Sequence, residues 1–397
     1  MSLILTLNAG SSSIKFGLYA PSDEPREEAR GQIDALGPEA RLVIEAGGVE
    51  TSEVIGPADH ATGLARLIAA LGPLCAARQI AAVGHRVVHG GPDIDGPRVL
   101  TPALVAQLDA LAPLAPLHQP HNLAGVRAAL AAFPEAVQVA AFDTAFHRGH
   151  PFVNDTFALP RRFFEAGVRR YGFHGLSYDY IAGRLRAVHP RLFEGRVIVA
   201  HLGNGASLCA LEGGRSVAST MGFSALDGMP MGTRVGQLDP GVVLFLLDQG
   251  MTAGQITDLL YKESGLKGLS GISHDMRVLL ASEAREAEEA IAYYSFRLAR
   301  EIGGLAAALG GIDALVFTGG IGENAGPIRA RAVAKLGFLG LAVDADRNAV
   351  NAATIHAGRV PILVMATDEE RIIARACARA LLTKGAEGEN WIPCVSS

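Results

Sequence analysis

The sequence predicts an α/β protein of two related domains with a cleft between them, and three observations support this prediction. The chain has 397 residues, more than one hydrophobic core usually organises, so two domains are expected. Short apolar segments alternate with stretches of helical periodicity, a pattern typical of α/β proteins. Apolar segments also run into polar, glycine-containing turns near residues 1–20, 197–211 and 314–330, which indicates an internal duplication.

The N-terminal half is expected to begin with antiparallel strands and to continue with helices. Apolar or alternating segments at 3–8, 13–19 and 40–46 are closely spaced and therefore predict neighbouring strands of antiparallel hairpins. The apolar segment 137–143 predicts a further strand that ends in a carboxylate. Helical periodicity predicts three helices in this half, at 59–72, 102–111 and 122–132.

The C-terminal half is predicted to contain its own strands and helices and to return its last helix to the first half. The strands are expected at 197–200, 314–317 and 361–365, and the helices at 175–188, at 283–309 and after the last strand. The expected lobes are residues 1–147 with 370–397, and residues 148–369.

Composition excludes several classes of function. The net charge is −5 and no Lys/Arg run occurs, which argues against nucleic acid as a partner. Although 49% of the residues are hydrophobic, no apolar run is long enough for a membrane span, and no signal peptide is predicted. Cys75, Cys209, Cys377 and Cys394 lack metal-like spacing. This cysteine pattern is typical of a reducing compartment, so a cytoplasmic protein is expected.

The most informative motif is the segment Asn8-Ala-Gly-Ser-Ser-Ser-Ile-Lys15, which directly follows the first apolar segment. Successive turn N–H groups form an anion-binding concavity, which the hydroxyls of Ser11 and Ser13 and the ammonium of Lys15 extend. The apolar alternation resumes at Ile14, so the turn joins two hairpin strands and differs from a P-loop, which opens a helix. The competing interpretation is a Ser/Gly hairpin turn without a ligand.

Two later segments repeat this pattern of an apolar strand followed by a polar, glycine-containing turn. A β-branched segment runs into His201-Leu-Gly-Asn-Gly-Ala-Ser207, and another apolar segment runs into Thr318-Gly-Gly-Ile-Gly-Glu-Asn-Ala325. Glycine allows a ligand to approach the backbone closely. Three such turns on one chain predict a nucleotide that is held from several sides.

Several cationic or imidazole groups stand in settings unlike a solvated surface. Arg86 lies inside an apolar segment, and a buried arginine needs an anionic partner, either a ligand or a structural carboxylate. His118 lies between prolines, where a structural turn histidine is the simpler interpretation, and His174 precedes a predicted helix. Arg234 ends a long loop, and Asp143 ends a strand, where α/β proteins place functional groups.

These residues fit phosphoryl transfer to a carboxylate. A carboxylate acceptor is already ionised at neutral pH, so it needs no general base, unlike an alcohol. Catalysis then depends on bringing two anions together in line and neutralising the charge of the transferring group. Several cations, few candidate bases and one Mg²⁺ are the expected components.

Taken together, the motifs resemble those of the acetate kinase family, within the acetate and sugar kinase, Hsp70 and actin superfamily. They occur in the family's order across nearly the whole chain. The matching segments are Asn8–Lys15, Gly84–Gly91, Phe142–His147, Arg169–Gly175, His201–Ser207, Met221–Arg234, Ser273–Arg277 and Thr318–Asn324.

The resemblance implies a fold and a reaction. The fold would be the duplicated actin-like ATPase fold, in which helices flank a ribonuclease H-like sheet in each lobe and a central cleft separates the lobes. The reaction would be the reversible, Mg²⁺- or Mn²⁺-dependent transfer of the ATP γ-phosphate to acetate by direct in-line transfer, giving acetyl phosphate and ADP. A cytoplasmic homodimer is implied, with no nucleic-acid or membrane partner.

The resemblance also implies roles for single residues. Asn8 and Glu369 would hold the metal ion. Arg86, Arg234 and His174 would act on the carboxylate and the transferring phosphoryl group. Asp143 would orient an arginine or the metal, His118 would lie nearby, and Val88, Leu117 and Phe173 would line the acyl pocket. The nucleotide would be held by Lys15, Ser11, Ser13, His201, Gly203, Asn204, Gly205, Asp275, Met276, Arg277, Gly320, Ile321, Gly322 and Asn324.

The sequence departs from the family pattern near the acyl pocket. Ala225 stands where proline is usual, and Gln119 follows His118 where asparagine is usual. A missing ring leaves room for an extra methylene, whose burial is worth only about 0.8 kcal/mol. The preference between acetate and propionate therefore stays open, and a propionate or other short-chain carboxylate kinase is the alternative.

Two other classes compete with this interpretation. Gly320–Ala325 fits the G-x-G-x-x-[GA] pattern after a strand, with Asp344 at a suitable distance, so an NAD-dependent dehydrogenase is one rival. Too little sequence follows for a full dinucleotide domain. The second rival is an ATP-hydrolysing switch related to actin and Hsp70, which would leave Arg86, Arg234 and His174 without a role.

Overall fold

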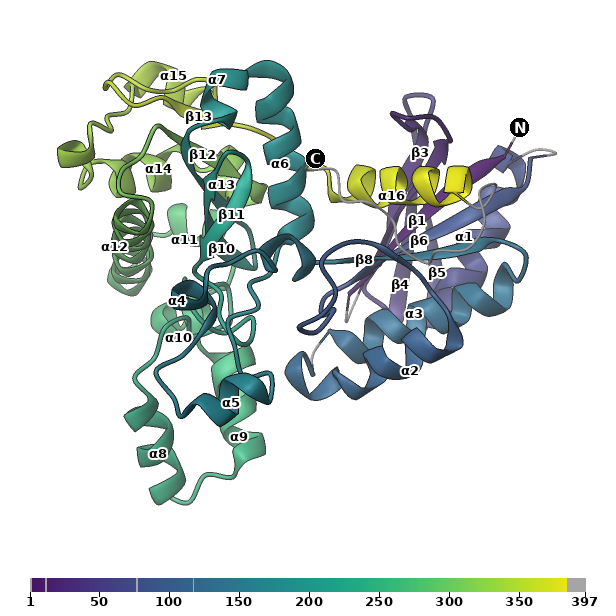
Figure 1. Cartoon of the computed structure of the whole chain (residues 1–397), viewed down its shortest axis with the longest axis horizontal. Helices are drawn as coiled ribbons and strands as arrows, with labels where there is room; N and C mark the ends of the chain where they lie inside the picture. The colour runs from purple at the N-terminus through teal and green to yellow at the C-terminus, as the bar shows by residue number, and fades with distance from the viewer. Residues whose placement is uncertain (1, 11–12, 76–77, 117, 384–397) are drawn as a thin grey trace. The chain divides into compact units, whose positions relative to one another are not determined.

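The computed structural model describes residues 2–10, 13–75, 78–116 and 118–383. Its contacts divide the chain into two compact units (Figure 1). The first unit runs to Arg148 and includes the helix α16, and the second unit runs from Gly149 to Thr367. Within the described residues, no helix is long and apolar enough to cross a membrane.

The first unit is built on an eight-stranded sheet with the order β5-β4-β3-β2-β1-β6-β8-β7. Strand β1 pairs antiparallel with β2 and parallel with β6, and β6 pairs parallel with β8. The elements of this unit are β1 (Leu3–Ala9), β2 (Ile14–Ala20), β3 (Arg26–Asp34), β4 (Gly37–Ala46), β5 (Val49–Ala58), α1 (His60–Cys75), β6 (Ile80–Val87), β7 (Arg98–Val99), α2 (Pro102–Ala110), α3 (Gln119–Ala132), β8 (Val137–Phe142) and α16 (Glu369–Thr383).

Helices cover both faces of this sheet. Leu5 and Leu7 point to the face that packs against α1 and α3, whereas Ile4 points to the face covered by α16. Because both faces are buried, β1 is a nearly continuous apolar segment. Helix α16, yellow in Figure 1, approaches the sheet closely at Gly84, where a Cβ atom would lie 2.4 Å from Ile373 Cγ2.

The second unit contains a five-stranded sheet with the order β11-β10-β9-β12-β13. Strand β9 pairs antiparallel with β10 and parallel with β12, which repeats the β2-β1-β6 arrangement of the first unit. Its elements are α4 (Phe152–Asp155), α5 (Arg161–Glu165), α6 (Gly175–Val188), α7 (Pro190–Phe193), β9 (Arg196–Leu202), β10 (Ala206–Glu212), β11 (Arg215–Ser219), α8 (Pro240–Asp248), α9 (Ala253–Asp258), α10 (Gly265–Ser270), α11 (Met276–Leu280), α12 (Arg285–Ala308), β12 (Ala314–Thr318), α13 (Gly319–Asn324), α14 (Gly326–Val333), α15 (Ala345–Ala349) and β13 (Ile362–Val364).

Candidate active site

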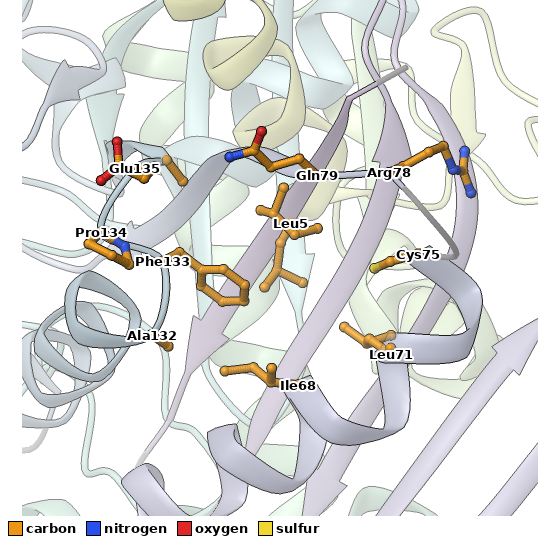
Figure 2. Close-up of a pocket in the computed structure, with 13 residues that line it drawn as sticks. Leu5, Ile68, Leu71, Cys75, Arg78, Gln79, Ala132, Phe133, Pro134 and Glu135 are labelled. Carbon is orange, nitrogen blue, oxygen red and sulfur yellow. The ribbon is translucent and has the colours of Figure 1, made fainter.

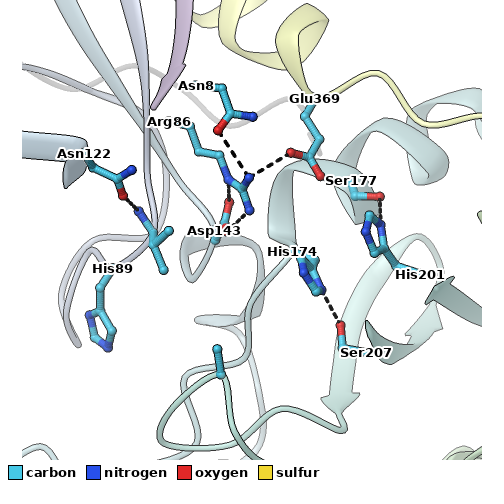
Figure 3. Close-up of polar contacts among 12 residues, drawn as sticks. Asn8, Arg86, His89, Asn122, Asp143, His174, Ser177, His201, Ser207 and Glu369 are labelled. Carbon is cyan, nitrogen blue, oxygen red and sulfur yellow. Dashed lines mark hydrogen bonds and ion pairs between the residues drawn. The ribbon is translucent and has the colours of Figure 1, made fainter. Parts of the chain in front are cut away.

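The first unit gathers three other predicted site residues around Arg86. The carboxyl ends of the parallel strands β1, β6 and β8 meet at one edge of the sheet, where α/β proteins place functional groups. Asn8, Arg86 and Asp143 lie at or just beyond these strand ends, and Glu369 lies at the start of α16. Figure 3 shows their side chains turned toward one another.

Arg86 makes two charge-assisted hydrogen bonds to one carboxylate. Its Nε donates to Asp143 Oδ1 at 2.9 Å and its Nη2 donates to Asp143 Oδ2 at 2.6 Å. The Nη1 atom faces Asn8 Oδ1 at 3.3 Å and Glu369 Oε2 at 3.4 Å. The forked bond fixes the plane of the guanidinium, as is usual for Arg–carboxylate pairs. Asp143 thus orients Arg86 and leaves Nη1 toward Asn8 and Glu369.

Burial and charge act in opposite directions in this cluster. Burial disfavours the guanidinium of Arg86, but the carboxylates of Asp143 and Glu369 outweigh that effect and raise the pKa of Arg86. Burial raises the pKa of Glu369, while Arg86 and Lys15 act to lower it. Arg86 is therefore a permanent cation that holds acidic groups around it.

The predicted anion-binding turn connects β1 to β2 as a hairpin. Gly10 N–H donates to the carbonyl of Ser13 at 2.8 Å, and His60 Nε2 lies 2.7 Å from the carbonyl oxygen of Gly10. Lys15 is exposed and pairs in register with Asn8. Ser11 lies outside the described residues.

Two amides, which the sequence did not single out for such roles, organise the segment after β6. Asn122 Oδ1 accepts the backbone N–H of Val88 at 3.0 Å, and its Nδ2 donates to the carbonyl of Ala9 at 2.6 Å. Gln119 is fully buried; its Nε2 donates to the carbonyl of His89 and its Oε1 accepts the N–H of His89. Gln119, the departure from the family pattern, thus fixes the backbone after Val88.

The predicted acyl-pocket residues belong to both units. In the first unit, Val88 is buried and His118 immediately precedes α3. Leu117 lies outside the described residues. In the second unit, Phe173 is 2% exposed.

The second unit holds a set of imidazoles and hydroxyls. His174 Nδ1 lies 2.8 Å from Ser207 Oγ, which also contacts the hydroxyl of Tyr178. Ser177 Oγ lies 2.8 Å from His201 Nδ1, and the rings of His174 and His201 stack with centroids 4.3 Å apart (Figure 3). The sequence predicted the two histidines but missed the three hydroxyls, which no motif marked as partners.

Backbone conformation sets the position of His174. This residue has a φ of 57°, a left-handed backbone conformation that is uncommon for residues other than glycine. It occupies the N-cap position of α6. A Cβ atom at Gly205 would lie 3.2 Å from His174 Nε2. The predicted glycine therefore lets the β9–β10 turn lie close to the imidazole.

Arg234 lies at the end of the predicted loop segment. Its Nη1 is 3.4 Å from the carbonyl oxygen of Ala225 and 3.7 Å from Met231 Sδ. A second arginine, Arg170, pairs with Asp227 of the same loop at 3.0 Å. The departure at Ala225 is thus in direct contact with a predicted substrate-binding arginine.

A cavity of about 660 Å³ in the second unit collects most of the predicted adenosine-binding residues. The N-termini of α11 and α13 and the β9–β10 turn form much of its wall. Two further predicted glycines do not line it: Gly322 is buried in α13, and Gly205 lies beside His174. The predicted residues that line the cavity are Gly203, Asn204, Asp275, Met276, Arg277, Gly320, Ile321 and Asn324.

The donor set for a metal consists of oxygen atoms. In the described part of the chain, no three His, Cys, Asp or Glu side chains are placed to hold a metal ion. Asn8 supplies an amide oxygen and Glu369 a carboxylate, both beside Arg86. Mg²⁺ commonly uses one or two carboxylates, waters and substrate phosphates rather than a complete protein cage. The residues present fit such a site.

Comparison with known proteins identifies the family. The model of the acetokinase family matches residues 3–375. This chain belongs to the acetokinase family. Among its relatives, the acetate kinase of Methylocella silvestris is 52% identical over 388 residues, which cover 94% of this chain and 96% of the relative.

Two solved structures, described as a propionate kinase and an acetate kinase, share the fold. A propionate kinase from Francisella tularensis gives a TM-score of 0.89 at 36% identity, covering 94% of this chain and 98% of that one. The acetate kinase of Porphyromonas gingivalis gives 0.84 at 36% identity with the same coverage. The predicted two-domain actin-like ATPase fold is confirmed, and membership of the acetokinase family sets aside the dehydrogenase.

Proposed function

We propose that this acetokinase-family chain is an acetate kinase that transfers the γ-phosphoryl group of ATP to acetate and back. An acetate oxygen forms a bond to the γ-phosphorus while the bond from that phosphorus to the β–γ bridging oxygen breaks. The electron pair of the broken bond stays on ADP. The observation that carries the proposal is the oriented Arg86 cluster in a chain of this family, because an ionised acceptor needs cations rather than a base.

Arg86 and Arg234 are assigned to the carboxylate and the transferring phosphoryl group. Asp143 holds Arg86 before substrate binds, so little reorganisation is needed during the reaction. His174 is assigned to charge stabilisation in the transition state, with Ser207 setting the orientation of its ring. Lys15, Ser13 and His201 are assigned to the phosphates, and the cavity at Asp275 and Gly320 to adenosine.

Asn8 and Glu369 are the residues assigned to hold Mg²⁺, or Mn²⁺, in part through water. A divalent cation supplies charge neutralisation to the β- and γ-phosphates. The carboxylate of Glu369 is held near Arg86 at 3.4 Å, which keeps it at the end of the same strands as Asn8.

Ala225 bears on the choice of acid. Its backbone contacts Arg234, and its methyl side chain takes less room than the proline usual at this position. Propionate kinase is therefore the second candidate, and a structurally similar enzyme from Francisella tularensis is described as one.

A homodimer in a reducing cytoplasm completes the proposal. Helix α12 exposes Tyr293 and Phe296 at 40% and 50%, and α8 exposes Leu244 and Phe245 at 63% and 59%. Apolar groups exposed in this way are typical of a protein–protein interface. A Phe296→Glu substitution should shift the mass found by light scattering from dimer toward monomer.

The deciding experiment traps acyl phosphate with hydroxylamine in the presence of ATP, Mg²⁺ and straight-chain acids of two to four carbons. Acetate should give the highest kcat/KM, and a higher value with propionate would favour the second candidate. The Arg234→Ala variant serves as the negative control. Acyl phosphate from none of the acids would overturn the proposal.

A further inference from the structure

The cavities of the two units differ in what lies beside them. The cavity of the first unit, about 350 Å³, is lined mostly by apolar side chains such as Leu5, Ile68 and Phe133 (Figure 2). Apolar cavities of this kind can stay empty. The cavity assigned to adenosine is bounded by α13, and the fully buried Arg329 of α14 lies at the end of that helix. A buried guanidinium needs hydrogen-bond acceptors, so its partners show what it holds in place.

Arg329 joins α13 to the region of α15. Its Nη1 donates to the carbonyl oxygens of Gly322 at 2.8 Å and Glu323 at 3.0 Å. Its Nε donates to Asn348 Oδ1 at 2.8 Å. Its Nη2 donates to the carbonyl oxygen of Asn348 at 2.9 Å and to Asn351 Oδ1 at 2.6 Å. All of these acceptors are neutral oxygens, so the guanidinium serves here as a hydrogen-bonding clamp.

Helix α13 depends on contacts from outside the helix. It spans six residues, Gly319–Asn324, and three of them are glycines, which are weak helix formers. Isolated helices shorter than about 12 residues are marginal in water. At the start of α13, the side chain of Glu323 accepts the N–H of Gly319 at 2.8 Å. At its end, Arg329 binds carbonyl groups that a terminal turn leaves without partners and that favour a cation.

The same short helix forms part of the cavity wall. Gly320, Ile321 and Asn324 line the cavity, and Asn324 Nδ2 donates to the carbonyl oxygen of Gly320 at 3.0 Å. The carbonyls that Arg329 binds belong to the same helical turn. A change in the position of that turn therefore moves the surface on which adenosine is bound.

We propose that Arg329 is a positioning residue for the nucleotide, which holds the end of α13 and thereby fixes the wall of the adenosine cavity. The inference rests on the assignment of this cavity to adenosine in the proposed function. Arg329 acts on the affinity for nucleotide rather than on the transfer step, because its hydrogen bonds go to α13 and to the region of α15.

Nucleotide binding to the full-length protein tests this role. Arg329→Met removes the guanidinium and keeps an unbranched side chain. Titration calorimetry with ADP and Mg²⁺ should show a Kd raised about tenfold or more, because several hydrogen bonds to α13 are lost. KM for ATP should rise in parallel, while kcat at saturating ATP stays within about twofold. Arg329→Lys keeps the charge without the planar fork, so it should recover only part of the affinity.

The matched control is Arg331→Ala on the same helix. Arg331 pairs with Glu288 of α12 at 2.6 Å and has a side chain that is 40% exposed. This variant should bind ADP as the unmodified protein does. An unchanged Kd for ADP in Arg329→Met, or an equal rise in Arg331→Ala, would overturn the proposal. A fall in kcat without a rise in KM for ATP would also contradict it.

A gentler variant decides the question if the Arg329 variants do not fold. Asn351 is exposed and has a φ of 51°, a conformation that glycine adopts readily. Asn351→Gly therefore removes one acceptor of Arg329 without backbone strain, and it should raise the Kd for ADP about threefold. Ala35→Gly, at a φ of 52° in the first unit, is its control and should change nothing. An unchanged Kd in Asn351→Gly would then reject the role of Arg329.

The unmodified protein separates this inference from the proposed function. If it neither binds ADP nor forms acyl phosphate, the proposed function fails, and the role of Arg329 fails with it. If it binds ADP and the Arg329→Met variant binds ADP equally well, only the role of Arg329 fails.

Discussion

The two units use the same strand–turn–strand plan for different chemistry. In each, a hairpin is extended by a strand parallel to its first member, β6 beside β1 and β12 beside β9. Asn8 and His201 occupy matching places just before the turn, opposite Lys15 and Ser207. Because the strand arrangement is the same, the side chains beside the two turns show how the units differ in chemistry.

The turn of the first unit lies beside ion-paired charged groups, whereas that of the second lies beside imidazoles, hydroxyls and one arginine, Arg234. Arg86 with Asp143 and Glu369 lies at the strand ends of the first unit. The second unit places His174 against Ser207 and stacks it on His201. The same strand arrangement therefore carries different side chains: the first unit holds an arginine oriented by carboxylates, and the second holds an imidazole oriented by a hydroxyl, with Arg234 nearby.

The largest expected effect is the removal of the fixed charge. Arg86→Ala should lower kcat about 10²–10³-fold, because it removes an oriented donor and leaves Asp143 without its partner. Acyl phosphate formation measures the effect, and circular dichroism checks that the fold persists. The control is Arg30→Ala on β3, which breaks an exposed ion pair with Glu45 of β4. This variant should keep full activity. Near-normal turnover in Arg86→Ala would contradict the catalytic role assigned to the charged cluster of the first unit.

The strand that carries Arg86 should also make the first unit sensitive to acid. His85 is buried beside Gln138, and burial lowers its pKa to about 4. The unfolded chain binds this proton near pH 6.5, so the free energy of unfolding should fall by up to about 3 kcal/mol as the pH drops from about 6.5 to about 4.

The His85→Leu variant isolates this contribution. Its free energy of unfolding, measured in urea at several pH values, should vary less with pH over this range than that of the unmodified protein. Equal pH dependence in the two proteins would mean that His85 is not held neutral in the folded state.

A smaller effect is expected from the imidazoles and hydroxyls of the second unit. Ser207→Ala removes the hydroxyl that contacts His174 Nδ1, and a hydrogen bond of about 1–1.5 kcal/mol corresponds to a roughly tenfold loss of kcat. KM for ATP and acetate should stay nearly constant, because the hydroxyl orients a catalytic ring rather than a substrate. Ser216→Ala, on β11 of the same sheet, is the matched control. A change in KM without a change in kcat would contradict the positioning role of Ser207.

The smallest effect concerns the adenosine cavity. Arg277 lines it with a side chain that is 90% exposed and paired with Asp275. Arg277→Ala should raise KM for ATP less than tenfold and leave kcat unchanged, since exposed charges contribute little. Titration calorimetry with ADP measures the change in affinity. Arg285→Ala, an equally exposed arginine on α12, should bind normally, and an equal loss there would argue against the assigned cavity.

The elements that the sequence predicted well are those that bury side chains on both faces or along one helical stripe. Strand β1, the hairpin to β2, and helices α6 and α12 match their predicted ranges within two residues at each end. Strands β3 and β5 were missed. Their sequences, REEARGQID and VETSEVIGPA, are polar, and β5 is largely exposed while β3 is mostly half-buried. Hydrophobic alternation is therefore absent, and hydrogen bonding to β2 and β4 stabilises both strands.

The charged members of the candidate site could be predicted because charge inside an apolar segment is conspicuous. Their partners could not. Asn122 joins Val88 and Ala9, which are far apart in sequence, and Ser207 on β10 contacts His174, which precedes α6. Amides and hydroxyls are common in helices and strands, and only the tertiary fold decides which of them meet a functional group.

Helix α16 has a consequence for biosynthesis. The sheet of the first unit keeps Ile4, Ala82 and Val139 uncovered until Ala374 and Cys377 pack on them, and those residues are made only after the entire second unit. The first unit therefore cannot complete its fold until the ribosome has synthesised α16. Premature termination anywhere before α16 leaves an open apolar face, so chaperones that bind such surfaces should recognise truncated products.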